Sequence, residues 1–144
     1  MAEQNYANHT RIVPAFHMVL FGLIVLTLIG SCVNLYQSMG DHQRLYSASL
    51  IVVLTIAAVM LFFFSRIFAL KAQDRAIKAE ENLRHFVATG KLLDSRLTVR
   101  QIIGLRFASD EEFVALAKRA ADENLTEDAI KRAVRNWRAD TYRV

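Results

Sequence analysis

The sequence predicts an all-α membrane protein: a two-helix transmembrane hairpin whose second helix extends into the cytoplasm, followed by three short helices. The 144 residues are 53% hydrophobic, and their mean hydropathy of +0.22 is high for a small soluble domain. Most of the apolar excess lies between Ile12 and Leu70, where two long segments lack Asp, Glu, Lys and Arg. The remainder of the chain has the charge pattern of ordinary helical protein.

The first transmembrane helix is expected over residues 15–37, after an N-terminal cytoplasmic flank of residues 1–14. Residues 15–34 alone would span about 30 Å, the thickness of a bilayer hydrocarbon core. Pro14 suits the first helical turn, where its missing N–H has no partner to lose. The string from Ile29 to Cys32 resembles the end of a lipoprotein signal peptide. The apolar run is longer than such signals, which favours an uncleaved span.

The second transmembrane helix is expected over residues 45–65, after a periplasmic turn of residues 38–44 that is short enough to force an antiparallel hairpin. Aromatic Phe62–Phe64 followed by cations is typical of a membrane interface, so the hydrocarbon part should end there. No Gly or Pro occurs between Leu45 and Gly90. The helix is therefore expected to continue through residues 66–90 and to stop at Gly90.

Basic residues predict the orientation of the two spans. Arg66, Lys71, Arg75 and Lys78 follow the second span, whereas the turn carries only Arg44. The positive-inside rule then puts both termini in the cytoplasm. The four cations after the span are expected to contact anionic lipid headgroups, so lipid rather than nucleic acid is the expected partner.

A cytoplasmic three-helix cap is expected over residues 91–144. Its helices are predicted over 98–106, 110–123 and 127–141. Thr98 and Ser109 each begin the spacing of a capping box, and Thr126 can cap the third helix. The apolar faces of these helices could close a small core.

An apolar stripe with helical spacing runs along residues 66–90 and comprises Ala72, Ala76, Ala79, Leu83 and Phe86. Together with Trp137 it is the expected interface with the chain's own cap or with a second copy. Binding to the membrane surface is the less favoured alternative, because small residues on a narrow line suit helix packing. The cap must fill its own core around Trp137. Part of the stripe is therefore expected to stay free and to favour a symmetric homo-oligomer.

Small and polar residues form the expected packing seam between the two spans. They are Thr27, Gly30, Ser31 and Asn34 on the first span and Thr55 and Ala58 on the second. Small residues let helix backbones approach, and an asparagine can hydrogen-bond across a helix interface. A more specific interpretation is that these residues line a pore built by several subunits. No charged residue lies at mid-span to support it.

No catalytic, cofactor-binding or metal site is expected. Cys32 is the single cysteine, which excludes an intramolecular disulfide and a zinc site built from cysteines. The four histidines share no metal-ligand spacing, and the common nucleotide-binding and hydrolase motifs are absent from the sequence. Asp110, Glu111 and Glu112 fall in a first helical turn, where the helix dipole favours acids.

Three segments, Gln4–His9, Leu105–Glu112 and Ala129–Asp140, resemble a family of small bacterial two-span membrane proteins that carries only a domain-of-unknown-function label. The resemblance covers almost the whole chain. It implies a bacterial inner-membrane protein with a helical cytoplasmic tail, and it supplies no activity, cofactor or catalytic residue.

Three functions are compatible with these features. The leading hypothesis is a non-enzymatic scaffold or accessory subunit, anchored by the hairpin, which binds copies of itself or a larger membrane complex. The second is a homo-oligomeric channel. An enzyme acting at the membrane surface ranks last, because no pair of catalytic groups has a usable spacing.

Overall fold

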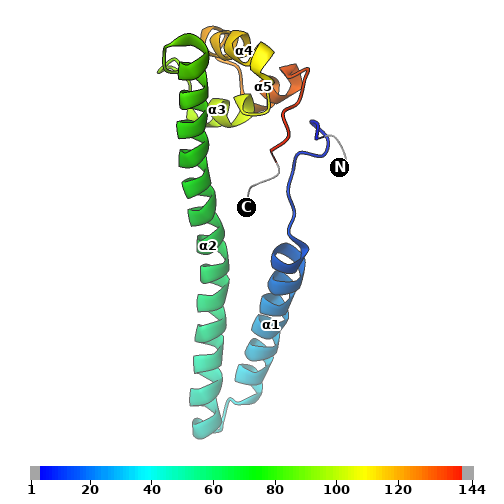
Figure 1. Cartoon of the computed structure of the whole chain (residues 1–144). Helices are drawn as coiled ribbons and strands as arrows, with labels where there is room; N and C mark the ends of the chain where they lie inside the picture. Colours follow the sequence, from blue (N-terminus) through cyan, green and yellow to red (C-terminus); the bar gives the residue numbers. More distant parts are fainter. Residues whose placement is uncertain (1–3, 141–144) are drawn as a thin grey trace. The chain divides into compact units, whose positions relative to one another are not determined.

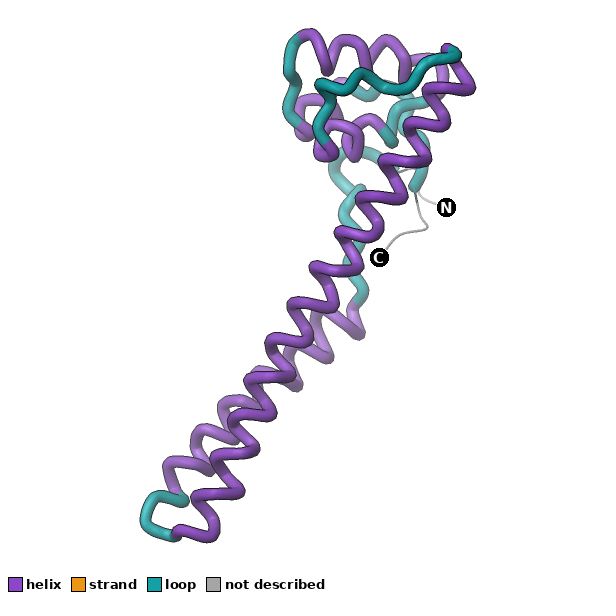
Figure 2. The backbone as a smooth tube through the Cα atoms, turned by 90° about the vertical axis from the view of Figure 1, so that its left-hand side faces the viewer, coloured by secondary structure: helices purple, strands orange, loops and turns teal. Residues whose placement is uncertain are grey.

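The computed structural model describes residues 4–140, and this part of the chain is all-helical, with no strand (Figures 1 and 2). A short π-helix, η1, precedes five α-helices. The elements are η1 (Ala15–Leu20), α1 (Phe21–Gln37), α2 (His42–Thr89), α3 (Val99–Leu105), α4 (Asp110–Asp122) and α5 (Glu127–Ala133). The chain divides into two compact units. We call Ile12–Phe68 the apolar unit, and Met1–Arg11 with Ala69–Val144 the cap unit.

The two predicted apolar helices are present. Ala15–Gln37, which joins η1 to α1, and α2 are both long and apolar enough to cross a membrane. Their large apolar side chains, such as Leu26 and Leu54, are mostly exposed. The core helix of a soluble protein differs in this respect, because it buries its apolar side chains.

In the apolar unit, α1 and the first part of α2 run antiparallel. The ring of Phe16 stacks on that of Phe62 with 4.4 Å between the centroids. Helix α2 begins at His42, three residues earlier than the expected span, so only residues 38–41 link the helices. Asp41 explains the early start, because its Oδ1 accepts hydrogen bonds from the backbone N–H groups of Gln43 (3.1 Å) and Arg44 (3.2 Å).

Helix α2 continues without interruption to Thr89, as the lack of Gly and Pro predicts. Gly90 follows with φ 72°, in the left-handed region that favours glycine after a helix. The predicted end of this helix is therefore confirmed.

The core of the cap unit lies between α3, α4 and α5, where Ile102, Leu105, Phe107, Phe113 and Ile130 are completely buried. Helices α3 and α5 approach closely at Gly104. A Cβ atom placed there would lie 3.0 Å from the Glu127 carbonyl oxygen and 3.1 Å from Ile130 Cγ2. The glycine is thus required by packing.

The starts of α3 and α5 are capped as predicted. Thr98 and Gln101 form a reciprocal capping box, and Thr126 Oγ1 accepts from the backbone N–H of Ala129 at 3.2 Å. Ser109 precedes α4, but its side chain makes no capping bond. The expected capping box at Ser109 is therefore absent.

The third cap helix was expected to reach residue 141, and this prediction is wrong: α5 ends at Ala133. The carboxylate of Glu112 accepts hydrogen bonds from the backbone N–H groups of Arg135 (3.2 Å) and Asn136 (3.1 Å). These N–H groups would otherwise bond to carbonyls one turn earlier. The chain then runs extended, and an isolated bridge pairs Trp137 with Ala108.

Candidate functional site

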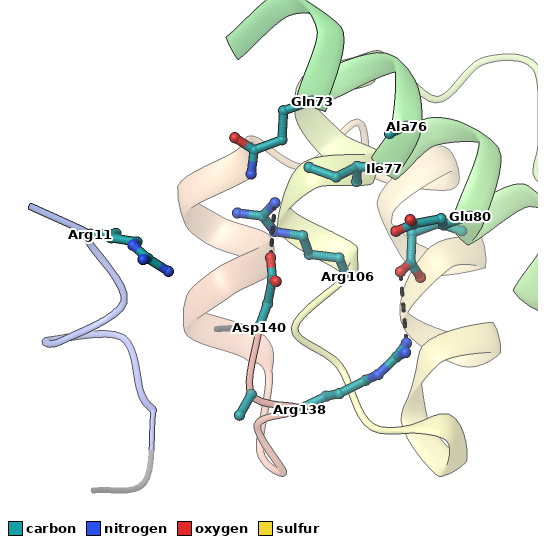
Figure 3. A pocket seen from close by; sticks show the side chains of 10 residues that line it. Arg11, Gln73, Ala76, Ile77, Glu80, Arg106, Arg138 and Asp140 are labelled. Carbon is teal, nitrogen blue, oxygen red and sulfur yellow. Dashed lines mark ion pairs between the residues drawn. The ribbon is translucent and has the colours of Figure 1, made fainter. Parts of the chain in front are cut away.

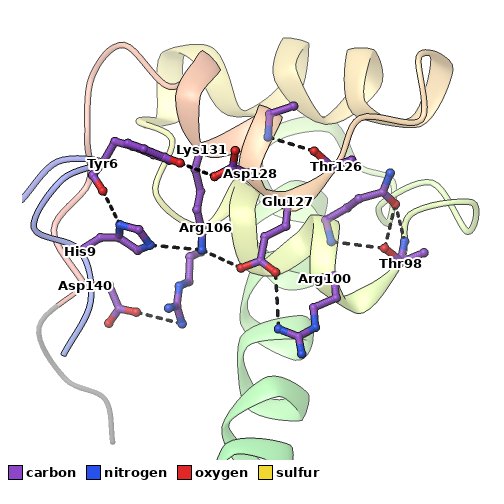
Figure 4. A network of polar contacts seen from close by, with 12 residues as sticks. Tyr6, His9, Thr98, Arg100, Arg106, Thr126, Glu127, Asp128, Lys131 and Asp140 are labelled. Atoms are coloured by element: carbon purple, nitrogen blue, oxygen red, sulfur yellow. Dashed lines mark hydrogen bonds and ion pairs between the residues drawn. The ribbon is translucent and has the colours of Figure 1, made fainter. Parts of the chain in front are cut away.

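The N-terminal segment Gln4–His9 packs onto the C-terminal part of the cap unit (Figure 4). Gln4 Oε1 accepts from the Asp140 backbone N–H at 2.7 Å. The Tyr6 hydroxyl donates to Asp128 and accepts from Arg132 Nη2 at 3.1 Å. Two ends of the chain that are 136 residues apart in sequence are thus held in one unit.

His9 completes this contact with both its ring and its nitrogens. Its ring lies 5.8 Å from that of Phe107 and 5.9 Å from that of Trp137, measured between centroids. Lys131 Nζ donates to His9 Nε2 at 3.4 Å, and His9 Nδ1 lies 2.6 Å from the Tyr6 carbonyl oxygen. The three segments that carry the family resemblance are therefore in contact with one another.

Arg84 joins α2 to the core of the cap unit, and it also forms a buried ion pair within α2. Arg84 Nη1 lies 3.1 Å from Glu81 Oε2, and the two side chains are only 13% and 6% exposed. Arg84 also donates to the carbonyl oxygen of Ala108 (2.8 Å) and to Asp110 Oδ1 (2.7 Å). Its guanidinium lies 4.2 Å from the centroid of the Phe113 ring, a cation–π distance.

A cavity of about 550 Å³ opens between α2, Arg11 and the extended C-terminal segment (Figure 3). Such a volume is in the range of small-ligand sites. Its lining combines three guanidinium groups with three carboxylates. They are Arg11, Arg106 and Arg138, and Glu80, Glu81 and Asp140.

Two ion pairs hold the interior of this cavity. Arg106, whose side chain is 9% exposed, lies with Nη1 3.1 Å from Asp140 Oδ2. Arg138 Nη1 lies 3.8 Å from Glu81 Oε1. Glu80 has no ion pair or hydrogen-bond partner anywhere in residues 4–140. The cavity therefore offers an available carboxylate beside partly neutralised guanidinium groups.

A surface cluster formed by the loop after α2 and the end of α4 perturbs the ionisation of its members. Arg96 Nη2 lies 2.6 Å from Asp94 Oδ2 and 2.9 Å from Asp122 Oδ1. The hydrogen bond from Arg96 lowers the pKa of Asp94 to about 2, and the same bond raises the pKa of Arg96. At the N-terminal contact, the hydrogen bond to Tyr6 raises the pKa of Arg132.

The predicted interface residues and the predicted lipid-contacting cations differ in their exposure. The stripe residues Ala72, Ala76, Ala79, Leu83 and Phe86 are all exposed. Trp137 is half-buried and packs against the cap core. Arg66 is half-buried, whereas Lys71, Arg75 and Lys78 are exposed.

Of the six seam residues, Ser31 and Thr55 are buried and Ala58 is half-buried, while Thr27, Gly30 and Asn34 are exposed. The hydroxyls of Ser31 and Thr55 donate to carbonyl oxygens of their own helices, Leu28 (2.8 Å) and Ile51 (2.8 Å). These two bonds do not cross between the helices.

Sequence reasoning missed the cavity and the N-terminal contact. One sequence signal could have indicated the cavity wall on α2: Ile77, Glu81 and Arg84 repeat at helical spacing and so share a face of that helix. The positions of Arg11 and Asp140 depend on long-range packing, which no local pattern reveals. No group of three or more potential metal-ligating side chains occurs within residues 4–140.

Comparison with known proteins identifies one family and no characterised relative. Residues 1–144 match the Family of unknown function (DUF6526). Neither a curated protein nor a solved structure matches the chain. Because the match covers the full length, the chain belongs to the Family of unknown function (DUF6526).

Proposed function

We propose that this protein is a non-enzymatic scaffold or accessory subunit of the bacterial inner membrane, anchored by a two-span hairpin, which self-associates or joins a larger membrane complex. Both termini and the cap unit lie in the cytoplasm in this proposal. The observation that carries it is an exposed apolar stripe along the part of α2 that belongs to the cap unit.

The contact between the chain ends supports the proposed topology. Gln4 and Asp140 are hydrogen-bonded in one compact unit, so both lie on the same side of any membrane that the chain crosses. Two crossings satisfy this requirement and one does not. The cations after the second span, Arg66 and Lys71 among them, favour the cytoplasm for that side.

Two opposite faces of α2 support self-association. Ile77 and Glu81 are buried against the cap. At 100° per residue, the stripe lies on the other side of the helix. There Leu83 is 62% exposed, Phe86 49% and the neighbouring Val87 78%. A contiguous apolar surface of this kind is a typical protein-interaction site.

The composition of the stripe favours a second copy of the same helix. Ala72, Ala76 and Ala79 carry small side chains on successive turns, which allows two helix backbones to approach closely. Copies inserted in one membrane share their orientation and are confined to two dimensions, so their effective concentration is high. A symmetric contact between stripes would bury the apolar surface of both chains.

The test replaces Ala79 with Glu. Purified in mild detergent and in lipid nanodiscs, the wild-type protein should form a discrete oligomer, whereas Ala79→Glu should shift towards monomer because a charge would enter the interface. Ala115→Glu is the matched control, since Ala115 is an exposed helical alanine of the same unit, and it should keep the wild-type mass. Light scattering gives the mass in each case. A monomeric wild-type protein in both media would contradict self-association.

A further inference from the structure

We propose that two copies of the chain pair through residues 69–90 of α2, parallel and in register, with Arg75 of each copy opposite Glu80 of the other. This inference rests on the self-association proposed above. It adds the orientation of the partner helix, its register and the charges that select it.

Small and apolar residues on the outward side of this segment recur at alternating intervals of three and four positions. When each repeat of seven positions is lettered a to g, Ala69, Ala76, Leu83 and Gly90 occupy position a, and Ala72, Ala79 and Phe86 occupy position d. A repeat of this kind over about three heptads, with charges at e and g, is the pattern of a coiled coil. Positions a and d would therefore face a second copy along the whole segment.

The cap leaves this side of α2 open. Ile77 and Glu81 are buried against the cap and occupy positions b and f, on the opposite side of the helix. At positions a and d, Leu83 is 62% exposed and Phe86 49%. A hollow lined in part by Glu80 lies beside them and leaves the e position accessible. A second helix can thus lie along positions a and d while the cap stays in place.

Arg75 and Glu80 flank the open side with opposite charges. Arg75 occupies position g, and Glu80 occupies position e of the next heptad. In a parallel coiled coil, the g residue of one helix faces the e residue five positions further on in its partner. A symmetric dimer makes this contact twice, once on each side. Copies that cross one membrane in the same direction can form only the parallel arrangement.

Arg75 lacks a partner in its own chain. Its guanidinium makes no ion pair and no hydrogen bond within residues 4–140. The positions one helical turn away carry no acid; they are Lys71, Ala72, Lys78 and Ala79. Arg75 also lies about 15 Å along the helix beyond Ser65, further than the headgroup layer of about 5–8 Å. The geometry therefore favours a partner helix over a lipid headgroup as the group that Arg75 contacts.

Glu80 is likewise unpaired within residues 4–140. Arg138 of the cap lies beside it (Figure 3), but the ion pair of Arg138 is with Glu81, at 3.8 Å. Arg84, one turn later on α2, is held by Glu81 and Asp110. Both nearby guanidinium groups are therefore engaged, and the Glu80 carboxylate is available to a cation of a second copy.

Cysteine cross-linking tests the register in the full-length protein, in isolated membranes and with Cys32 replaced by Ser. Ala79→Cys should form a disulfide between copies on mild oxidation, because a residue at position d meets its own counterpart at the dimer axis. Lys78→Cys, at position c on the side of the helix away from the axis, is the matched control and should not cross-link. A discrete wild-type oligomer in which Ala79→Cys fails to cross-link would refute the pairing.

Charge reversal tests the contact between Arg75 and Glu80. Arg75→Glu and Glu80→Arg should each weaken self-association by about tenfold, because two attractive pairs become two repulsive ones. When the two variants are co-expressed with different tags, the mixed dimer regains both attractive pairs. It should then exceed the statistical share set by the two homodimers by about tenfold. Co-purification through the tags measures that share.

Lys78→Glu is the matched control for Arg75→Glu. It makes the same change of charge on the same helix, but position c does not face Glu80 of the other copy. Co-expressed with Glu80→Arg, it should give only the statistical share of mixed dimer. An excess of mixed dimer in this control would mean that net charge, and not the Arg75–Glu80 contact, selects the partner.

The outcomes separate the pairing from the self-association on which it rests. A monomeric wild-type protein would contradict both. An oligomer that Ala79→Glu dissociates, but whose mixed charge variants stay at the statistical share, would refute the contact between Arg75 and Glu80 alone. Weakened association in Arg75→Glu that Glu80→Arg does not rescue would assign Arg75 to another ligand, such as an anionic lipid, and would also refute the pairing.

Discussion

Replacing Arg84 by Met tests how much the buried Arg84 guanidinium stabilises the packing of α2 on the cap core. The substitution keeps an unbranched side chain of similar length over Phe113 but removes every N–H donor. Glu81, 6% exposed, would retain only Arg138, at 3.8 Å. The carbonyl oxygen of Ala108 would lose its 2.8 Å donor.

The expected loss of stability follows from these two groups. Removing one partner of a buried pair costs about 3–5 kcal/mol, and an orphaned carbonyl adds about 1 kcal/mol. The open cavity beside Glu81 lets water solvate the remaining charge, which lowers the total. We expect Arg84→Met to reduce the free energy of unfolding by about 3 kcal/mol, near the lower end of that range.

A double-mutant cycle separates the buried charge from lost packing. In Glu81→Gln/Arg84→Met no carboxylate remains to be left unpaired, so the loss should fall to about 1–2 kcal/mol. Chemical unfolding in detergent can be followed by the fluorescence of Trp137, the single tryptophan, which packs on Phe107 with 4.9 Å between the ring centroids. A loss below about 0.5 kcal/mol for Arg84→Met, or strictly additive losses in the double mutant, would refute the reasoning.

Three other predictions concern topology, ionisation and packing. In a background without the native cysteine, a membrane-impermeant thiol reagent should label Asp41→Cys in whole cells and not Asn124→Cys; the reverse pattern would invert the topology. The Asp94 carboxylate should titrate near pH 2 by NMR, and its pKa should rise towards the usual 3.8 in Arg96→Gln, where only the backbone N–H of residue 96 still donates to it. Because folding lowers this pKa, the stabilisation is present above pH 3.8 and is lost as the pH falls towards 2. Gly104→Val should cost about 1–3 kcal/mol in the same unfolding assay, since the added side chain meets α5 at 3.0 Å; an unchanged stability would mean that α5 shifts freely.

The sequence predicts the helices well because their signals are local. Apolar length defines the two long helices, the lack of Gly and Pro predicts an unbroken α2, and Gly90 marks its end. The capping box at Thr98 is equally local. Each of these signals lies in one continuous stretch of sequence and does not depend on contacts with a distant segment.

The wrong end of α5 has a long-range cause. Periodicity in residues 127–141 favours a continuous helix, but Glu112 on α4 captures the backbone N–H groups of Arg135 and Asn136. The same glutamate was expected to complete a capping box at Ser109. A carboxylate three residues into a helix can bond to its own N-cap or to a neighbouring segment, and only the tertiary structure decides between them.

In the cap unit, one face of α2 buries charged residues and the other face exposes apolar ones. Periodicity shows which residues of the helix are apolar, but a polar face can also be the buried one. Here Glu81 and Arg84 face the core, and the apolar residues Leu83 and Val87 face outwards. A helix that only had to support the cap would gain stability from the opposite arrangement, because burying apolar surface is favourable whereas burying an ion pair carries a desolvation penalty. The outward apolar face is therefore the feature of α2 on which the proposed self-association rests.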